Sequence, residues 1–184
     1  MVVSKIQLSS NALIMLGANP ISSFTEDSAE ATIASNLYET SYLSILSSFD
    51  WNFAKKKATL ARLSETPTNK YKYKFQIPSD LLRLITTYPI SNYEILGDNL
   101  FTDSSTVDID YIYKVTEDMF PAFFLKSFEY YLAVQFAIPI TEDLNKIDVM
   151  QKLYEKESRR ARFNDSQEQP TKAIEHKPYI DVRY

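Results

Sequence analysis

Hydrophobic side chains recur every three to four residues in four segments of the chain, two near its beginning and two near its end. This spacing places them on one face of a helix, so it predicts four amphipathic helices. They are expected at residues 3–16, 27–48, 121–137 and 141–162. Gly17 is expected to end the first helix in a left-handed conformation, and Thr25 or Asp27 to cap the second. Pro121 suits the first turn of the third helix, and Thr141 can cap the fourth.

The middle third of the chain alternates between apolar and polar residues instead, which predicts β-strands. Residues 71–77 alternate strictly, with apolar side chains facing one way and polar side chains the other. Gly97 lies between two short apolar runs and predicts a hairpin, and residues 107–113 predict a further strand. Residues 81–88 form an apolar run that fits either a helix or a strand. Together these segments predict a small antiparallel sheet.

The order of the elements predicts an α+β fold, in which a four-helix body carries an inserted small antiparallel β-sheet. The helical body is expected at residues 1–50 and 119–163, and the β-rich insert at residues 51–118. Residues 1–163 are thus expected to form one domain. Helical spacing stops after this point, so residues 164–184 are expected to form an extended C-terminal arm.

Two blocks rich in aromatic residues stand out, at residues 49–54 and 71–84. The first contains Trp51, the only tryptophan, between two phenylalanines at the end of a predicted helix. Such a cluster could stack against a ligand, but aromatic side chains where a helix meets a sheet more often pack in the core. We interpret both blocks as an architectural junction.

The chain of 184 residues is long enough to bury a core, and the residue types that it lacks exclude many enzyme classes. It has no cysteine and a single histidine, His176, which excludes thiol nucleophiles, zinc ribbons and triads built on a core histidine. Its two glycines, Gly17 and Gly97, lie far apart, so a phosphate-binding loop or a dinucleotide fingerprint cannot form. No cofactor is expected.

Charge and hydropathy exclude further classes. The net charge of −4 argues against a strongly basic nucleic-acid-binding protein, although it permits a local basic patch. No segment approaches the roughly 18 uncharged apolar residues of a membrane-spanning helix, so no membrane contact is expected. A group of acidic residues lacks the spacing of a calcium loop and is interpreted as a solvated acidic face, with no metal bound. The group comprises Asp103, Asp108, Asp110, Glu117 and Asp118.

Five short motifs follow one another along the chain. Two come from the aromatic blocks: Trp51-Asn52-Phe53 at the end of a helix, and a Tyr/Phe strand that runs into Pro78-Ser79-Asp80-Leu81-Leu82-Arg83. The other three are a helix stop, a hairpin and a late helix, at residues 16–24, 94–103 and 119–139. In order and spacing these motifs resemble the head-to-tail adaptor family of short-tailed bacteriophages, also called tail tubular protein A. The resemblance spans about residues 3–162 and leaves the arm unmatched.

This resemblance implies a structural virion protein rather than an enzyme. It implies a ring of twelve copies beneath the portal protein at one capsid vertex, which joins head to tail and leaves a channel for DNA. The implied partners are the other copies, the portal protein, the next tail (nozzle) protein and, through loose contacts, the passing DNA. Assembly in the host cytoplasm and a final place in the virion tail follow from the same resemblance.

Two groups of residues are candidates for these contacts. The end of the arm carries aromatic and β-branched residues that suit a groove on a partner, and related adaptors grip the portal with a C-terminal extension. These residues are Tyr179, Ile180, Val182 and Tyr184. A group of lysines could line the DNA channel, lie at a subunit interface, or form a solvated surface without further function. It comprises Lys55, Lys56, Lys57, Lys72 and Lys74.

Two alternatives to the adaptor function stay open. A tail-associated cell-wall hydrolase would need two carboxylates held a fixed few ångströms apart, and an acidic chain contains such pairs without a motif that singles one out. A DNA-binding accessory protein would instead be retained on DNA in a steeply salt-dependent way.

Overall fold

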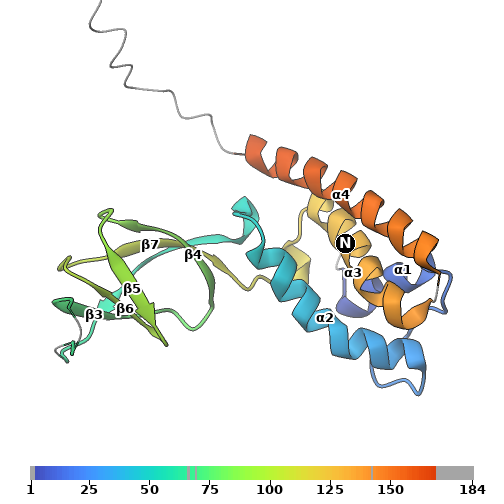
Figure 1. Ribbon diagram of the computed structural model, residues 1–184, viewed down its shortest axis with the longest axis horizontal. Helices are drawn as coiled ribbons and strands as arrows, with labels where there is room; N and C mark the ends of the chain where they lie inside the picture. The colour runs from blue at the N-terminus through green and yellow to red at the C-terminus, as the bar shows by residue number, and fades with distance from the viewer. Residues whose placement is uncertain (1–2, 66, 69, 142, 169–184) are drawn as a thin grey trace, which may run out of the picture.

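The computed structural model describes residues 3–65, 67–68, 70–141 and 143–168, which form two parts (Figure 1). The helical body, at the right of the view, contains the α-helices, and the β lobe, at the left, contains the strands. The lobe is inserted between the second and third helices of the body. The fold is therefore α+β with an antiparallel insert, as the sequence predicts.

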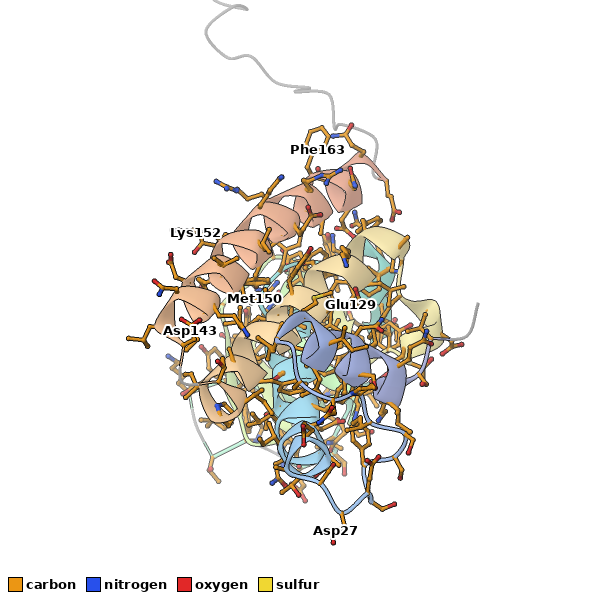
Figure 2. All side chains as sticks on the ribbon, turned by 90° about the vertical axis from the view of Figure 1, so that its right-hand side faces the viewer. Asp27, Glu129, Asp143, Met150, Lys152 and Phe163 are labelled. Carbon is orange, nitrogen blue, oxygen red and sulfur yellow. The ribbon has the colours of Figure 1, made fainter. Side chains whose placement is uncertain are left out.

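Within the described residues the helical body has four α-helices. They are α1 (Lys5–Met15), α2 (Ala29–Ser47), α3 (Ala122–Ile140) and α4 (Leu144–Gln167). α3 contacts each of the other three, so it occupies the centre of the body. Figure 2 views the body from the side away from the β lobe, with α4 lying alongside α3. Two short 3₁₀ helices, η1 (Asn52–Ala54) and η2 (Glu117–Met119), lie where the chain passes between the two parts.

Gly17 ends α1 as predicted. Its φ of +76° lies in the left-handed region, where a side chain would be strained. The backbone N–H groups of Gly17 and Ala18 donate to the carbonyls of Ile14 and Leu13 at 2.9 and 3.0 Å. This pair of bonds is a Schellman motif, which satisfies carbonyls that the helix end leaves open.

The cap of α2 differs from the prediction. Ser28 caps this helix, because its hydroxyl accepts a hydrogen bond from the N–H of Ala31 at 3.2 Å. Thr25, one of the two predicted caps, is engaged earlier in the turn, where its hydroxyl pairs with that of Ser23 at 2.8 Å. Asp27, the other, precedes the capping position.

The boundary between α3 and α4 also differs from the prediction. α3 continues beyond Ala137 because Pro139 lies in its last turn, where few hydrogen bonds are lost. The N–H of Thr141 donates to the carbonyl of Ala137 at 2.8 Å, so Thr141 ends α3 rather than beginning α4. Asp143 caps α4 instead, and its carboxylate accepts from the N–H of Asn145 at 2.9 Å.

The last helix is longer than predicted. Residues 164–167 belong to α4, so the expected start of the extended arm at residue 164 is wrong. The helix continues because Asp165 is buried against the junction between the two parts, as described below. Residues 169–184 of the expected arm lie outside the described residues.

The β lobe contains two antiparallel sheets within the described residues, where the sequence predicted one. The first has the strand order β1-β7-β4 and the second the order β2-β3-β6-β5. The strands are β1 (Lys55–Thr59), β2 (Ala61–Arg62), β3 (Tyr73–Gln76), β4 (Leu81–Tyr88), β5 (Tyr93–Leu96), β6 (Asn99–Thr102) and β7 (Asp108–Tyr113). The run at residues 81–88, which fitted either state, is thus a strand. Only Leu60 separates β1 from β2, so the chain passes directly from one sheet into the other.

Each part has its own apolar core. In the helical body, aromatic side chains from α2, from α3 and from the residue before η1 pack together, among them Tyr42, Phe124 and Trp51. In the β lobe, side chains of both sheets meet between them. These are Leu60, Phe75, Leu100, Val107, Ile109 and Tyr111. The two cores explain why the insert folds as a distinct lobe on the helical body.

Candidate functional site

The two aromatic blocks singled out in the sequence meet at the junction between helical body and β lobe. Asp50, from the first block, forms an ion pair with the guanidinium of Arg83, from the second. Asp50 follows α2 of the body and Arg83 lies in β4 of the lobe. The prediction of an architectural junction is confirmed by this contact.

Trp51 is a core residue, as predicted, rather than an open stacking site. Its side chain is buried, and its indole N–H donates to the carbonyl of Ile45 at 3.1 Å. The rings of Phe49 and Phe124 each lie 5.0 Å from the indole, in edge-to-face arrangements. Phe53 packs beside them, 5.9 Å away. Aromatic side chains therefore occupy the faces on which a ligand would have to stack.

A buried carboxylate fastens the end of α4 to the same junction. The N–H of Asn52, at the start of η1, donates to both carboxylate oxygens of Asp165, at 2.9 and 3.1 Å. In return, the side-chain amide of Asn52 donates to the carbonyl of Asp165 at 2.6 Å. Lys55 of β1 completes the group, since its ammonium donates to the side-chain oxygen of Asn52 at 2.8 Å.

Burial has a measurable electrostatic consequence for Asp165. It raises the pKa of this carboxyl above its usual 3.8, against the opposing effect of the N–H donors of Asn52 and Phe53. Glu168 adds to the rise and Lys55 opposes it. The point from which the C-terminal segment leaves the body is thus held by a carboxylate that is costly to ionise.

The candidate lysines lie in two different sheets. Lys55, Lys56 and Lys57 belong to β1, whereas Lys74 belongs to β3 and Lys72 precedes it. Side chains alternate along a strand, so Lys56 faces away from its two neighbours. The structure does not gather the five ammonium groups on one strand face.

Several of these lysines have acidic partners. The ammonium of Lys57 lies 3.6 Å from Asp110, and that of Lys74 lies 2.7 Å from Glu65. The hydrogen bond from Lys74 lowers the pKa of Glu65. These neighbours offset part of the positive charge, so the lysines attract phosphate less strongly than free lysines would.

Lys56 takes part in a small polar cluster with the turn before β4. Its ammonium donates to one oxygen of Asp80 at 2.8 Å, and the hydroxyl of Tyr111 donates to the other at 3.1 Å. The hydrogen bond to Asp80 raises the pKa of Lys56, and the same bond lowers the pKa of Asp80. Asp80 belongs to the Pro-x-Asp-x-Leu-Arg motif. Through its bonds to Lys56 of β1 and Tyr111 of β7, this motif connects the two strands.

Two acidic residues of the insert lie beside one surface hollow, and each is engaged by a neighbouring side chain. Asp108 and Asp110 lie two residues apart on β7, beside a surface hollow of about 630 Å³. Asp110 is paired with Lys57, and Asp108 accepts from the hydroxyl of Thr59. Among the described residues, no three His, Cys, Asp or Glu side chains are grouped as metal ligands.

An exposed apolar strip in the β lobe was not foreseen from the sequence. Five of the large apolar side chains that are exposed in the described residues fall within residues 88–96, and Ile90 is the most exposed of them at 87%. The strip comprises Tyr88, Ile90, Tyr93, Ile95 and Leu96. Exposed apolar side chains gathered in one short segment make that segment a candidate interaction site. The adjacent pair Ile95 and Leu96 could have indicated this exposure from the sequence. Neighbours in a strand face opposite ways, so the two side chains cannot both point into the same core.

The candidate arm residues, Tyr179, Ile180, Val182 and Tyr184, lie outside the described residues. In the part of the chain that the structure describes, no helix is both long and apolar enough to cross a membrane. Compared with known proteins, the chain matches no protein-family model and no curated protein sequence.

Proposed function

We propose that this protein is a head-to-tail adaptor, a structural component of a phage virion that forms a ring between portal and tail and completes the DNA channel. The protein would assemble in the host cytoplasm and remain at the portal vertex in the virion tail. It would act without a cofactor and without enzymatic activity, by holding its neighbours in place.

The ion pair between Asp50 and Arg83 is the observation that best supports this proposal. It joins the two aromatic blocks that contain two of the five motifs behind the resemblance to adaptors, so these two motifs lie at one structural junction. Around it, Trp51 is packed in the core and Asp80 is engaged by Lys56. Trp51 and Asp80 thus have structural contacts of their own. Contacts of this kind suit a connector that holds its neighbours in place.

In the proposed assembly the two parts would have separate roles. Helical bodies would pack side by side in a head-to-tail manner, the arrangement that closes into a ring. A ring of twelve would present twelve arms to the portal, so that weak individual contacts would suffice. The arm contacts would come from Tyr179, Ile180, Val182 and Tyr184. The β lobe would face the nozzle protein, and the partly compensated lysines would allow DNA to pass without being held.

The test is cosedimentation with the cognate portal ring, with the full chain compared with a chain that ends after Glu168. This end point keeps Asp165 and all of α4, so it removes only residues outside the described fold. We expect about twelve copies of the full chain to sediment with each portal ring. The shortened chain should stay in solution.

Thermal unfolding of the two chains is the control, because equal midpoints would show that shortening leaves the fold intact. Binding of neither chain would refute the adaptor function. Equal binding of both chains would keep the adaptor but refute the arm as its portal contact.

A further inference from the structure

Strand β5 (Tyr93–Leu96) forms one edge of the second sheet. It pairs in continuous register with β6, and within the described residues no strand pairs with its other side. In an antiparallel strand, every second residue directs its N–H and C=O away from the partner. Lysine and proline, which often protect such an edge, are both absent from β5. β5 therefore offers free backbone groups to a further extended segment.

The side chains around this edge define what the added segment should look like. Tyr93, Ile95 and Leu96 are all at least 40% exposed, so the segment should bring apolar side chains. Among the described residues no lysine or arginine forms an ion pair with Glu94, so a cation on the segment would find an open partner there. Glu94 is the acidic residue within β5 itself.

We infer that residues 180–184 of the same chain add to β5 as an antiparallel strand. Their sequence alternates between apolar and charged residues, as a strand with one apolar face requires. One register matches three of the four residues of β5 and leaves Leu96 opposite Asp181. It places Tyr184 opposite Tyr93, Arg183 opposite Glu94, and Val182 opposite Ile95. Opposite charges and apolar pairs directly across a ladder both stabilise it.

The arm starts close enough to reach this edge. The bonds between Asp165 and Asn52 hold the end of α4 at the junction, on the side of the body that faces the β lobe (Figure 1). From Glu168 to residue 180 the chain can span about 40 Å. The strands that lead from the junction into the lobe, β1 and β2, together cover about 25 Å, and β5 lies three strands across the sheet from β2, about 15 Å further.

Attachment to the same chain is favoured over attachment to a second copy. A tether of this length raises the effective concentration of the arm at β5 to about the millimolar range. This inference concerns the protein without its portal and does not rest on the proposed function. If the arm also grips a portal, the portal has to displace it from β5, so free protein and assembled protein would hold the arm differently.

A disulfide tests the inference directly, because the chain contains no cysteine of its own. In the variant Ile95→Cys with Val182→Cys, the two thiols would lie directly opposite, within the Cα separation that a disulfide allows. The matched control is Ile95→Cys with Asp181→Cys, which shifts the second thiol by one residue to the other face. Both full-length variants are oxidised mildly at low protein concentration, without portal, and followed on non-reducing gels.

We expect the first variant to form an intrachain disulfide about tenfold faster than the control, because only its thiols share a face. Equal rates in the two variants would overturn the inference, since a loose arm does not distinguish neighbouring positions. Disulfide-linked dimers without the intrachain product would also overturn it, because they would place the arm on a second copy.

Reversal of one charge tests the register. Glu94→Arg, added to the first variant, should slow disulfide formation by about two- to fivefold, because two arginines then face each other. Further addition of Arg183→Glu should restore the original rate. A rate that stays low after the second reversal would refute this register. These measurements are made without portal, whereas the portal assay uses the unsubstituted full chain and the chain that ends after Glu168, so the inference and the proposed function can fail separately.

Discussion

The carboxylate of Asp165 in α4 accepts hydrogen bonds from the backbone N–H of Asn52, although 113 residues separate the two in sequence. A short helix begins at Asn52, and no side chain of its own segment caps it. Asp165 supplies the missing acceptor from the other end of the fold. The contact joins the last helix to the segment that leads into the β lobe, so it ties together the body, the lobe and the start of the arm.

Removal of this acceptor should destabilise the protein. Asp165→Ala leaves the part-buried N–H of Asn52 without its acceptor, and loss of such an acceptor typically costs about 1–3 kcal/mol. The loss should appear in the unfolding free energy from urea titration. Asp148→Ala, in an exposed ion pair on the same helix, is the control and should change stability by less than about 0.5 kcal/mol. Equal effects of both substitutions would contradict the capping role.

The raised pKa of Asp165 predicts the sign of a pH effect. The folded protein holds this proton more tightly than the unfolded chain, whose pKa is near 3.8. The resulting stabilisation is complete below 3.8 and is lost as the pH rises through the higher folded pKa. The unfolding free energy of the natural chain should therefore fall relative to that of Asp165→Asn between about pH 3 and pH 7.

The comparison with Asp165→Asn matters because carboxyls with lowered pKa values, such as Asp80, change stability in the opposite direction. Their contributions are common to both chains and cancel in the difference. A difference that stays flat with pH, or that grows in favour of the natural chain, would contradict burial as the dominant effect on Asp165.

Trp51 should be among the most sensitive positions in the chain. Trp51→Ala removes a fully buried indole from between Phe49 and Phe124, and such truncations cost about 3–5 kcal/mol. Trp51→Phe keeps part of the aromatic packing and should cost less. Urea titration followed by circular dichroism measures both, since the substitutions remove the only tryptophan fluorophore. A loss below about 1 kcal/mol for Trp51→Ala would show that the cluster is not a core.

The ion pair between Asp50 and Arg83 should contribute modestly, because both side chains are partly exposed to water. A double-mutant cycle with Asp50→Ala and Arg83→Ala should give a coupling energy of about 0.5–1 kcal/mol. Its value should fall when salt is added, since exposed charges are screened. A coupling that is zero at low salt would remove this pair as an energetic link between body and lobe.

Helices and the stop at Gly17 could be predicted because their causes lie within a few residues of each other. An apolar face repeats at the helical period, and a glycine suffices for the left-handed turn that ends α1. The core position of Trp51 was also predictable, from its place between two phenylalanines at the end of a helix. The caps were less so, since Thr25, Asp27 and Ser28 are all suitable residue types and lie within four positions of one another.

Pairing of the strands could not be read from the pattern. A period of two shows that residues 71–77 and 107–113 are extended, but it does not say which strand lies beside which. The division into two sheets depends on Leu60, because the chain crosses from β1 to β2 there. Residues of both sheets pack against Leu60. The lysines were expected as one group for the same reason, and the structure distributes them over both sheets.

The amino-acid sequence by itself determined the α+β class, the position of the insert and the aromatic junction, because these depend on local spacing and residue type. Tertiary structure alone decided that α4 extends past Phe163, that Asp165 caps η1, and that one edge of the lobe exposes an apolar strip. These features arise where segments distant in sequence meet. A hydrogen bond or a buried surface forms only when both partners are in place, and no local pattern records the second partner.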